Sequence, residues 1–118
     1  MQTNILGTNL ELCCSSPITG FYRDGVCRTS QEDTGTHTVC AILTDEFLQF
    51  SKSKGNDLTT AMPQYGFPGL KKGDKWCLCA LRWKEAHEAG CAPKIVAEAT
   101  SNATIKFIDK EVLLKYKI

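Results

Sequence analysis

The residues with the clearest chemical potential are two cysteines within the segment GDKWCLCALRW, residues 73–83. Cys77 and Cys79 stand two positions apart in a short apolar run, which predicts a strand over 76–80. Successive side chains of a strand point to opposite faces, so both thiols are expected on one face and their apolar neighbours on the other. Two adjacent thiols on a rigid strand are typical of a packed core, a metal site or reactive sulfur.

A metal site is one hypothesis for these thiols. Structural zinc usually takes cysteine and histidine ligands in pairs about two to four residues apart. The sequence has one Cys-x-Cys pair and one His-x-x-Cys pair, from His37 to Cys40. If residues 37–40 are all strand, His37 and Cys40 face opposite sides, so metal binding would require His37 to belong to the preceding loop. The zinc hypothesis uses Cys27, His37, Cys77 and Cys79 as ligands; otherwise no cofactor is expected.

A small thiol-dependent enzyme is a second hypothesis. A reactive cysteine needs a base, a cation or a helix N-terminus close to its sulfur. The nucleophile would be Cys79 or Cys27, with His37 as the base and Asp33 orienting the imidazole. Cys79 also comes just before a predicted helix. The sequence contains no recognised catalytic-cysteine signature.

The leading hypothesis is a binding or accessory module. Its cleft would form from the loops at 23–37 and 56–75, beside the strand that carries the two cysteines. It would bind a small polar ligand or a peptide. The expected polar contacts are Arg28, Asp33, His37, Asn56, Asp57 and Arg82. For Asn56 and Asp57 turn chemistry is the alternative, because they follow a glycine that ends a helix.

These side chains are positioned by elements that periodicity and turn signals predict. A buried strand is predicted over 37–43, followed by a helix that Thr44 caps and Gly55 ends. A second helix is predicted over 81–89 and a short third one after residue 109. The Asp24–Gly25 dipeptide favours a hairpin over 20–29, and two further strands are predicted over 94–99 and 104–108.

Between the first helix and the cysteine strand lies a long connection, residues 56–74. Loops of that length inside a compact domain are uncommon and often functional. Its apolar residues are expected to pin it to the body of the protein, or to form an interface over 62–70 if the protein is a purely structural partner.

The elements together predict an α+β fold with one domain over residues 1–118. The expected architecture is a two-layer sandwich: a mostly antiparallel sheet of four or five strands carrying two or three short helices. Strand order does not follow from the sequence.

Composition narrows the range of partners. The 14 basic and 13 acidic residues give a net charge of +1, which argues against strong electrostatic binding of nucleic acid or an anionic membrane. No apolar run approaches the roughly 20 residues that a membrane span needs. The sequence predicts neither nucleic acid nor membrane as a partner, and it leaves the oligomeric state open.

Cysteine usage bears on the compartment. The chain has 7 cysteines, an odd number, and its first residues lack the pattern of a secretory signal. We therefore expect a cytoplasmic location, where thiols stay reduced, and mostly buried free cysteines.

Four segments of the chain match a known pattern: TGFYRDGVCRT, EDTGTHTVCA, GNDLTT and FPGLKKGDKWCLCALRW. With them the chain resembles a family of small bacterial and plant proteins catalogued as a conserved domain of unknown function. The resemblance implies a compact two-layer α+β fold and brings no established activity, cofactor or substrate. Cys14 and Cys91 lie outside the shared pattern. The matched positions with chemical potential include Arg23, Asp24, Cys27, Arg28, Asp33, His37, Cys40, Asn56, Asp57, Asp74, Cys77, Cys79 and Arg82.

Overall fold

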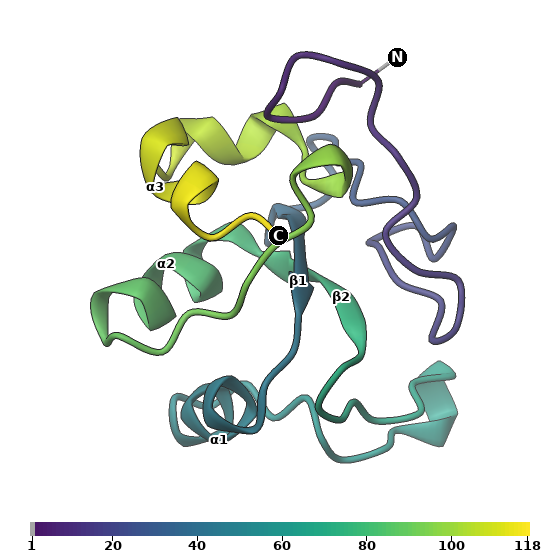
Figure 1. The fold of residues 1–118 in the computed structure, drawn as a ribbon. Coiled ribbons are helices and arrows are strands. Elements are labelled where there is room, and N and C mark those ends of the chain that lie inside the picture. The colour runs from purple at the N-terminus through teal and green to yellow at the C-terminus, as the bar shows by residue number, and fades with distance from the viewer. Residues whose placement is uncertain (1) are drawn as a thin grey trace.

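An antiparallel pair of strands lies at the centre of the protein in the computed structural model, which describes residues 2–118 (Figure 1). Strand β1 (His37–Ile42) pairs with strand β2 (Lys75–Cys79). In this register Cys40 is opposite Cys77, and His37 is opposite Cys79. The register shifts between His37 and Val39, so the ladder is irregular at the end that carries His37. The two predicted strands through the cysteines are confirmed.

Helices follow directly from both strands. Helix α1 (Asp45–Ser53) is capped by Thr44, whose hydroxyl accepts a hydrogen bond of 3.1 Å from the Phe47 N–H. Gly55 follows the helix with φ 89°, a conformation that glycine adopts without a steric penalty. Helix α2 (Ala80–Glu88) begins where β2 ends, with Cys79 as its N-cap residue. Both predicted helices are confirmed to within one residue at each end.

Helices α2 and α3 (Lys110–Lys115) lie on one side of the strand pair, and the loops of the N-terminal region lie on the other (Figure 1). Helix α2 contacts α1 and both strands. The main apolar core sits between these elements and contains the fully buried side chains of Trp83, Phe47 and Leu78. None of the described helices is long and apolar enough to cross a membrane.

The sheet is smaller than predicted. An α+β fold is confirmed, but within residues 2–118 the sheet has two strands, not four or five. The predicted strand over 94–99 pairs with β1 only at Ile95 and then turns into the 3₁₀ helix η2 (Ala97–Ala99). The predicted strand over 104–108 falls largely on another 3₁₀ helix, η3 (Asn102–Lys106).

Buried hydroxyl groups explain why these two segments turn. The Thr100 hydroxyl donates to the Val96 carbonyl at 2.9 Å, and the Ser101 hydroxyl accepts from the Ala103 N–H at 3.2 Å. The Thr104 hydroxyl donates to that of Thr38 on β1 at 2.8 Å. Such local side-chain bonds compete with a strand ladder, and here they outweigh the strand preference of threonine and isoleucine.

The predicted hairpin over 20–29 is wrong. Val26 forms its bridge with Leu12, and the Gly25 carbonyl accepts from the Cys13 N–H at 2.7 Å, so this segment pairs with the N-terminal segment instead of with itself. Gly25 has φ 88°, a conformation that other residues rarely adopt, and a Cβ there would also lie 3.0 Å from the Cys14 carbonyl oxygen. The Asp24–Gly25 signal thus marks a turn, but not the pairing of its flanks.

The long connection between α1 and β2 contains only one helical turn, η1 (Pro63–Tyr65). Leu70 is buried, and the Phe67 ring packs edge-on against Trp76 with ring centroids 5.4 Å apart. Tyr65, by contrast, is 75% exposed. The second half of the loop is therefore held to the body of the protein as expected, whereas its tip is not.

Candidate functional site

Four of the seven cysteines form two disulfides, Cys13–Cys40 and Cys27–Cys77. Each bond joins an N-terminal loop to one of the two strands, and the free thiols are Cys14, Cys79 and Cys91. The expectation of reduced thiols throughout is therefore wrong for this structure. It follows that Cys27 has no free thiol to act as a nucleophile, and of the two candidates Cys79 keeps one.

The predicted zinc ligands do not form one cluster. Among residues 2–118, the His, Cys, Asp and Glu side chains whose ligand atoms lie within 4.8 Å of one another are those of Cys13, Cys27 and Cys77. This group shares Cys27 and Cys77 with the predicted set and leaves out His37 and Cys79. A group with three sulfur atoms could hold a soft metal, but two of these cysteines are bonded to each other and the third to Cys40.

A buried carboxylate orients the imidazole of His37. The His37 Nδ1–H donates to Asp33 Oδ1 at 2.6 Å, and Asp33 Oδ2 accepts from the His37 backbone N–H at 2.8 Å and from the Thr29 hydroxyl at 3.0 Å. Burial acts to raise the pKa of Asp33, but the hydrogen bonds from His37 and Thr29 outweigh it and hold the pKa below its ordinary value. The carboxylate only accepts, so it keeps a proton on Nδ1 and leaves Nε2 of the neutral ring able to take one.

Two neighbours lie close to this imidazole. The Phe21 ring stacks on one face with centroids 6.1 Å apart and an interplanar angle of 23°. Gly35 lies so close that a Cβ there would come within 2.7 Å of His37 Cε1. The position of the ring is therefore set by the hydrogen bond to Asp33, by the stacked Phe21 ring and by the close approach of Gly35.

His37 and Cys79 line the same pocket, which has a volume of about 210 Å³. Its lining comes from four places: the start of β1, the residues after α1, strand β2 and the first turn of α2. The structure thus brings together the predicted site residues His37, Asn56, Cys77, Cys79 and Arg82. Leu58, Trp76 and Leu78 complete the walls.

Cys79 is the free thiol of this pocket. It is half-buried and occupies the N-cap position of α2, where its side chain makes no capping hydrogen bond. The N-terminus of a helix favours negative charge. Cys91 differs, because burial and the charge of Glu46 raise the pKa of its thiol. The two thiols therefore stand in different surroundings within one small protein.

Arg82 brings a positive charge to the pocket. Its guanidinium donates to the Lys54 carbonyl at 3.2 Å and pairs with Glu85 at 3.4 Å, which ties α2 to the end of α1. Both side chains of the ion pair are more than one-third exposed, so the pair leaves the guanidinium open to solvent. Arg82 can contact an anionic group while it keeps its contact with α1.

Three of the predicted binding residues do not line this pocket: Asp33, which bonds to His37, and Arg28 and Asp57, which lie elsewhere. Arg28 pairs with Asp24 at 2.6 Å and covers the Tyr22 ring. Asp57 accepts from the hydroxyl groups of Thr59 and Thr60, which lowers the pKa of its carboxyl. Neither Arg28 nor Asp57 lines the pocket of Cys79. The hydrogen bonds from Thr59 and Thr60 give Asp57 a role in a turn, which is the alternative that the sequence offered.

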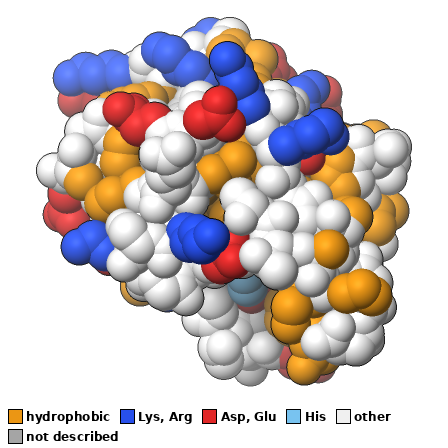
Figure 2. All heavy atoms as spheres, turned by 90° about the horizontal axis from the view of Figure 1, so that it is seen from below, with side chains coloured by type: hydrophobic (Ala, Val, Ile, Leu, Met, Phe, Trp, Pro, Cys, Tyr) orange, Lys and Arg blue, Asp and Glu red, His pale blue; other side chains and the backbone are white. Residues whose placement is uncertain are grey.

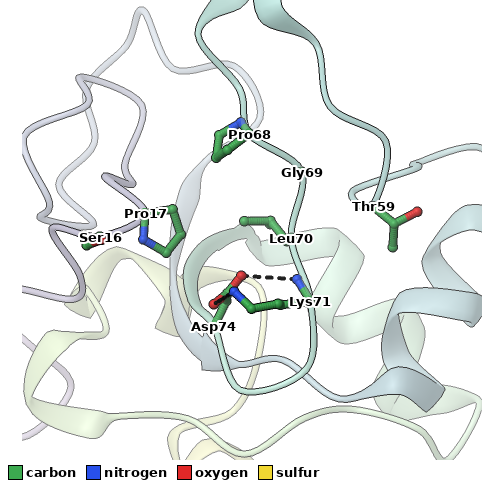
Figure 3. Close-up of a pocket in the computed structure, with 8 residues that line it drawn as sticks. All are labelled: Ser16, Pro17, Thr59, Pro68, Gly69, Leu70, Lys71 and Asp74. Carbon is green, nitrogen blue, oxygen red and sulfur yellow. Dashed lines mark hydrogen bonds and ion pairs between the residues drawn. The ribbon is translucent and has the colours of Figure 1, made fainter.

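A second hollow, of about 480 Å³, lies between the Ser16–Pro17 turn and the loop before β2 (Figure 3). Its charged lining residues are Lys71 and Asp74, and these pair with each other at 3.3 Å. On the molecular face seen in Figure 2, Lys and Arg side chains are likewise interspersed with Asp and Glu side chains. Within residues 2–118 the hollow is lined by no cysteine and no histidine, so the pocket at Cys79 remains the better candidate.

The sequence reasoning missed the positioning role of Gly35 and Phe21. Both are in segments that it singled out, TGFYRDGVCRT and EDTGTHTVCA, but it treated Gly35 as a loop residue. It also did not pair Cys13 with Cys40. The proximity of Gly35 to His37 in the sequence was the available signal, whereas no spacing rule gives the cysteine pairing.

Comparison with known proteins agrees with the earlier resemblance. No curated protein matches the chain. Residues 3–117 match the family described as "Uncharacterized protein conserved in bacteria (DUF2237)". Because the match spans almost every residue, the chain belongs to this family of unknown function.

Proposed function

We propose that the pocket around Cys79 is a site of thiol chemistry on small anionic ligands. The observation that carries this proposal is the Asp33–His37 hydrogen bond of 2.6 Å, which orients an imidazole in the pocket of a free thiol. A base held by a third group beside a nucleophile is the general arrangement of covalent catalysis. Here Cys79 is the nucleophile, His37 the base and Asp33 a positioning residue.

The reaction begins with transfer of the Cys79 thiol proton to Nε2 of His37. The thiolate then attacks an electrophilic carbon of the ligand, forming a carbon–sulfur bond while the bond to the leaving group breaks. The leaving group departs with the bonding electron pair and takes up the proton from His37. Asp33 stabilises the imidazolium between these two steps.

The pocket limits the ligand. Its volume of about 210 Å³ is below the roughly 300–1,000 Å³ of pockets that take drug-sized molecules. Arg82 supplies a planar set of donors that fits a carboxylate, and Asn56 adds an amide nearby. A small carboxylate-bearing electrophile is the ligand class that fits both the volume and the charge.

Competitive alkylation tests this proposal on the oxidised protein. Iodoacetate is a small carboxylate whose iodide is displaced by a thiolate, and the modified cysteine is identified by peptide mass spectrometry. We expect Cys79 to react at least tenfold faster than Cys14 near neutral pH, and Cys91 to react most slowly. His37→Gln should remove most of the advantage of Cys79.

The charge of Arg82 gives the matched control. Arg82→Gln should slow the reaction of Cys79 with iodoacetate but not with neutral iodoacetamide, because only the first carries a carboxylate. Equal rates at Cys79 and Cys14, unchanged by His37→Gln, would refute the thiol chemistry.

A binding module without chemistry is the second candidate, and the lining by Arg82 and Asn56 favours it. It predicts that small carboxylates slow the iodoacetamide reaction of Cys79 by occupying the pocket, and that Arg82→Gln abolishes this protection. Protection without any His37-dependent reactivity would assign the pocket to binding alone.

A cytoplasmic location is part of the proposal. Disulfides persist mainly in oxidising compartments, so a cytoplasmic protein should carry Cys13, Cys27, Cys40 and Cys77 reduced. Trapping thiols with acid and an alkylating agent in intact cells measures this directly. Full disulfide occupancy in freshly trapped protein would contradict a cytoplasmic location.

A further inference from the structure

Next to the pocket, four cysteines form one buried cluster, and one of them, Cys77, also lines the pocket. Cys13, Cys27, Cys40 and Cys77 are each at most 6% exposed, and they pack together with Ala99. The sulfur atoms of Cys13, Cys27 and Cys77 lie within 4.8 Å of one another, although Cys13 belongs to one disulfide and the other two to the second. The two disulfides are therefore neighbours in space.

The backbone presents these cysteines as two facing pairs. Cys40 and Cys77 are directly opposite each other in the sheet. Cys13 and Cys27 come from loop segments that are joined by the Leu12–Val26 bridge. Each pair is thus held by backbone pairing that does not depend on the sulfur–sulfur bonds.

Hydrogen bonds to the strand cysteines hold the sheet side of the cluster in place. The Cys77 N–H donates to the Thr19 hydroxyl at 2.8 Å, and the Cys40 N–H donates to the Thr100 hydroxyl at 3.2 Å. Both threonines are fully buried. The strand positions are therefore fixed by hydrogen bonds as well as by the disulfides.

We propose that this cluster is a metal site that binds one Zn²⁺ when its four cysteines are reduced. Zinc in structural sites takes four ligands at tetrahedral corners, with zinc–sulfur bonds of about 2.3 Å. Two sulfurs bound to such an ion lie about 3.8 Å apart, as that bond length implies. The sulfurs of Cys13, Cys27 and Cys77 already lie within 4.8 Å of one another, whereas that of Cys40 is outside this group and is bonded to Cys13. The site uses Cys13 and Cys40 in place of His37 and Cys79 of the sequence-based hypothesis.

The disulfide and metal-bound states exclude each other. A small dithiol opens both disulfides by exchange, and two equivalents of dithiol become cyclic disulfides while four protein thiols form. Zn²⁺ then binds the four sulfurs, and four protons are released to solvent. The compartment therefore decides which state the protein adopts: two disulfides where it is oxidising, one zinc centre where it is reducing.

Metal titration of the reduced full-length protein tests this inference. The protein is reduced with a phosphine, freed of metal and titrated with Zn²⁺, and bound metal is measured by elemental analysis. We expect one Zn²⁺ per chain. Co²⁺ in its place should give the strong visible absorption of tetrahedral thiolate coordination, a readout that does not depend on any activity.

Cysteine variants locate the site. Cys40→Ser and Cys77→Ser should each weaken zinc binding at least tenfold. Cys14→Ser is the matched control for the N-terminal loop and Cys79→Ser for strand β2, and both should bind Zn²⁺ like the parent protein.

Two results would overturn the inference. One is reduced wild-type protein that binds no Zn²⁺ at micromolar free metal, which does not rely on any variant folding. The other is zinc binding that survives in Cys40→Ser but is lost in Cys79→Ser. Neither result bears on the alkylation of Cys79 in the oxidised protein, so this inference and the proposed function fail separately.

Discussion

Residues 37–90 contain both strands and the two longest helices, whereas residues 2–36 contain no helix and pair only through isolated bridges. In the first region backbone groups bond to one another within regular elements, and the apolar core packs behind them. In the second, scattered backbone hydrogen bonds are supplemented by side-chain hydrogen bonds and by the two disulfides. The comparison shows that the first region lines the candidate pocket, whereas the irregular region contributes to it by orienting His37.

Two buried polar residues illustrate how the irregular region is held. Asn4 donates to the carbonyls of Asn9 and Glu98 and to the Thr8 hydroxyl, and it accepts from the N–H groups of Leu6 and Thr8. These side-chain hydrogen bonds take the place of the strand-to-strand backbone hydrogen bonds that this loop lacks. Asp33 likewise accepts a hydrogen bond from the His37 backbone N–H and so stabilises the turn before β1. The same carboxylate therefore holds this loop and orients the imidazole of the candidate base.

The largest loss of stability should come from the core of the regular region. Trp83 is fully buried and stacks against His87, and its indole N–H donates to the Pro93 carbonyl at 3.1 Å. Trp83→Ala should lower the free energy of unfolding by about 3–5 kcal/mol, measured by urea denaturation. Trp83→Phe keeps an aromatic ring and loses the N–H and part of the buried volume, so it should cost less than Trp83→Ala. Equal losses would mean that packing of the ring contributes little.

Removal of one disulfide should affect the irregular region instead. Cys13 and Cys40 are 27 residues apart, and closing a loop of that length in the unfolded chain corresponds to about 3–4 kcal/mol. Cys13→Ala/Cys40→Ala should lose roughly that amount in the oxidised protein. Amide hydrogen exchange should rise over residues 2–36 and stay low in α2. Cys14→Ala is the control, and faster exchange spread evenly over the chain would contradict the division into two regions.

Asn4→Ala should cost less than either change, about 2–3 kcal/mol, because it leaves several buried backbone groups without a partner. Asn9→Ala, at an exposed asparagine five residues away, should change stability by less than about 0.5 kcal/mol. Thermal unfolding of the two variants measures the difference. Similar midpoints would show that the Asn4 side chain does not hold the N-terminal loop.

Asp33→Asn should give the smallest loss at neutral pH, on the order of 1 kcal/mol, together with a change in pH dependence. The folded protein holds the pKa of Asp33 below its ordinary value. Its contribution is therefore complete above about pH 4, where the unfolded carboxyl is ionised, and is lost as the pH falls through the lower folded-state pKa. Between pH 5 and pH 2 the free energy of unfolding should therefore fall less for Asp33→Asn than for the parent protein. Acid titration of the two proteins at constant temperature measures this difference. Parallel curves would mean that the Asp33 charge has no role in folding.

Local signals in the sequence predicted the regular region well. The Thr44 cap, the glycines at 55 and 90, and the alternation through Cys77 and Cys79 place α1, α2 and β2 within a residue or so. These features depend on contacts between residues only a few positions apart, and the tertiary structure keeps the elements that they predict.

Prediction failed in two segments, for different reasons. Residues 94–108 have strand-forming side chains, yet the hydroxyls of Thr100 and Ser101 bond to backbone groups a few residues away, and the Thr104 hydroxyl bonds to that of Thr38 on β1. The hairpin at Asp24–Gly25 failed because Val26 pairs with the distant Leu12. For the candidate site, sequence reasoning named Asp33, His37 and Cys79. That His37 and Cys79 line one pocket depends on how β1 and β2 pair.

The sequence by itself determined the α+β class, the family, and the presence of a carboxylate, a histidine and a thiol at suitable places along the chain. Only the tertiary structure decided which cysteines are bonded and which one remains free in a pocket. The physical reason is that helix caps and strand alternation act between neighbours, whereas sulfur pairing depends on segments 27 and 50 residues apart meeting in one buried cluster.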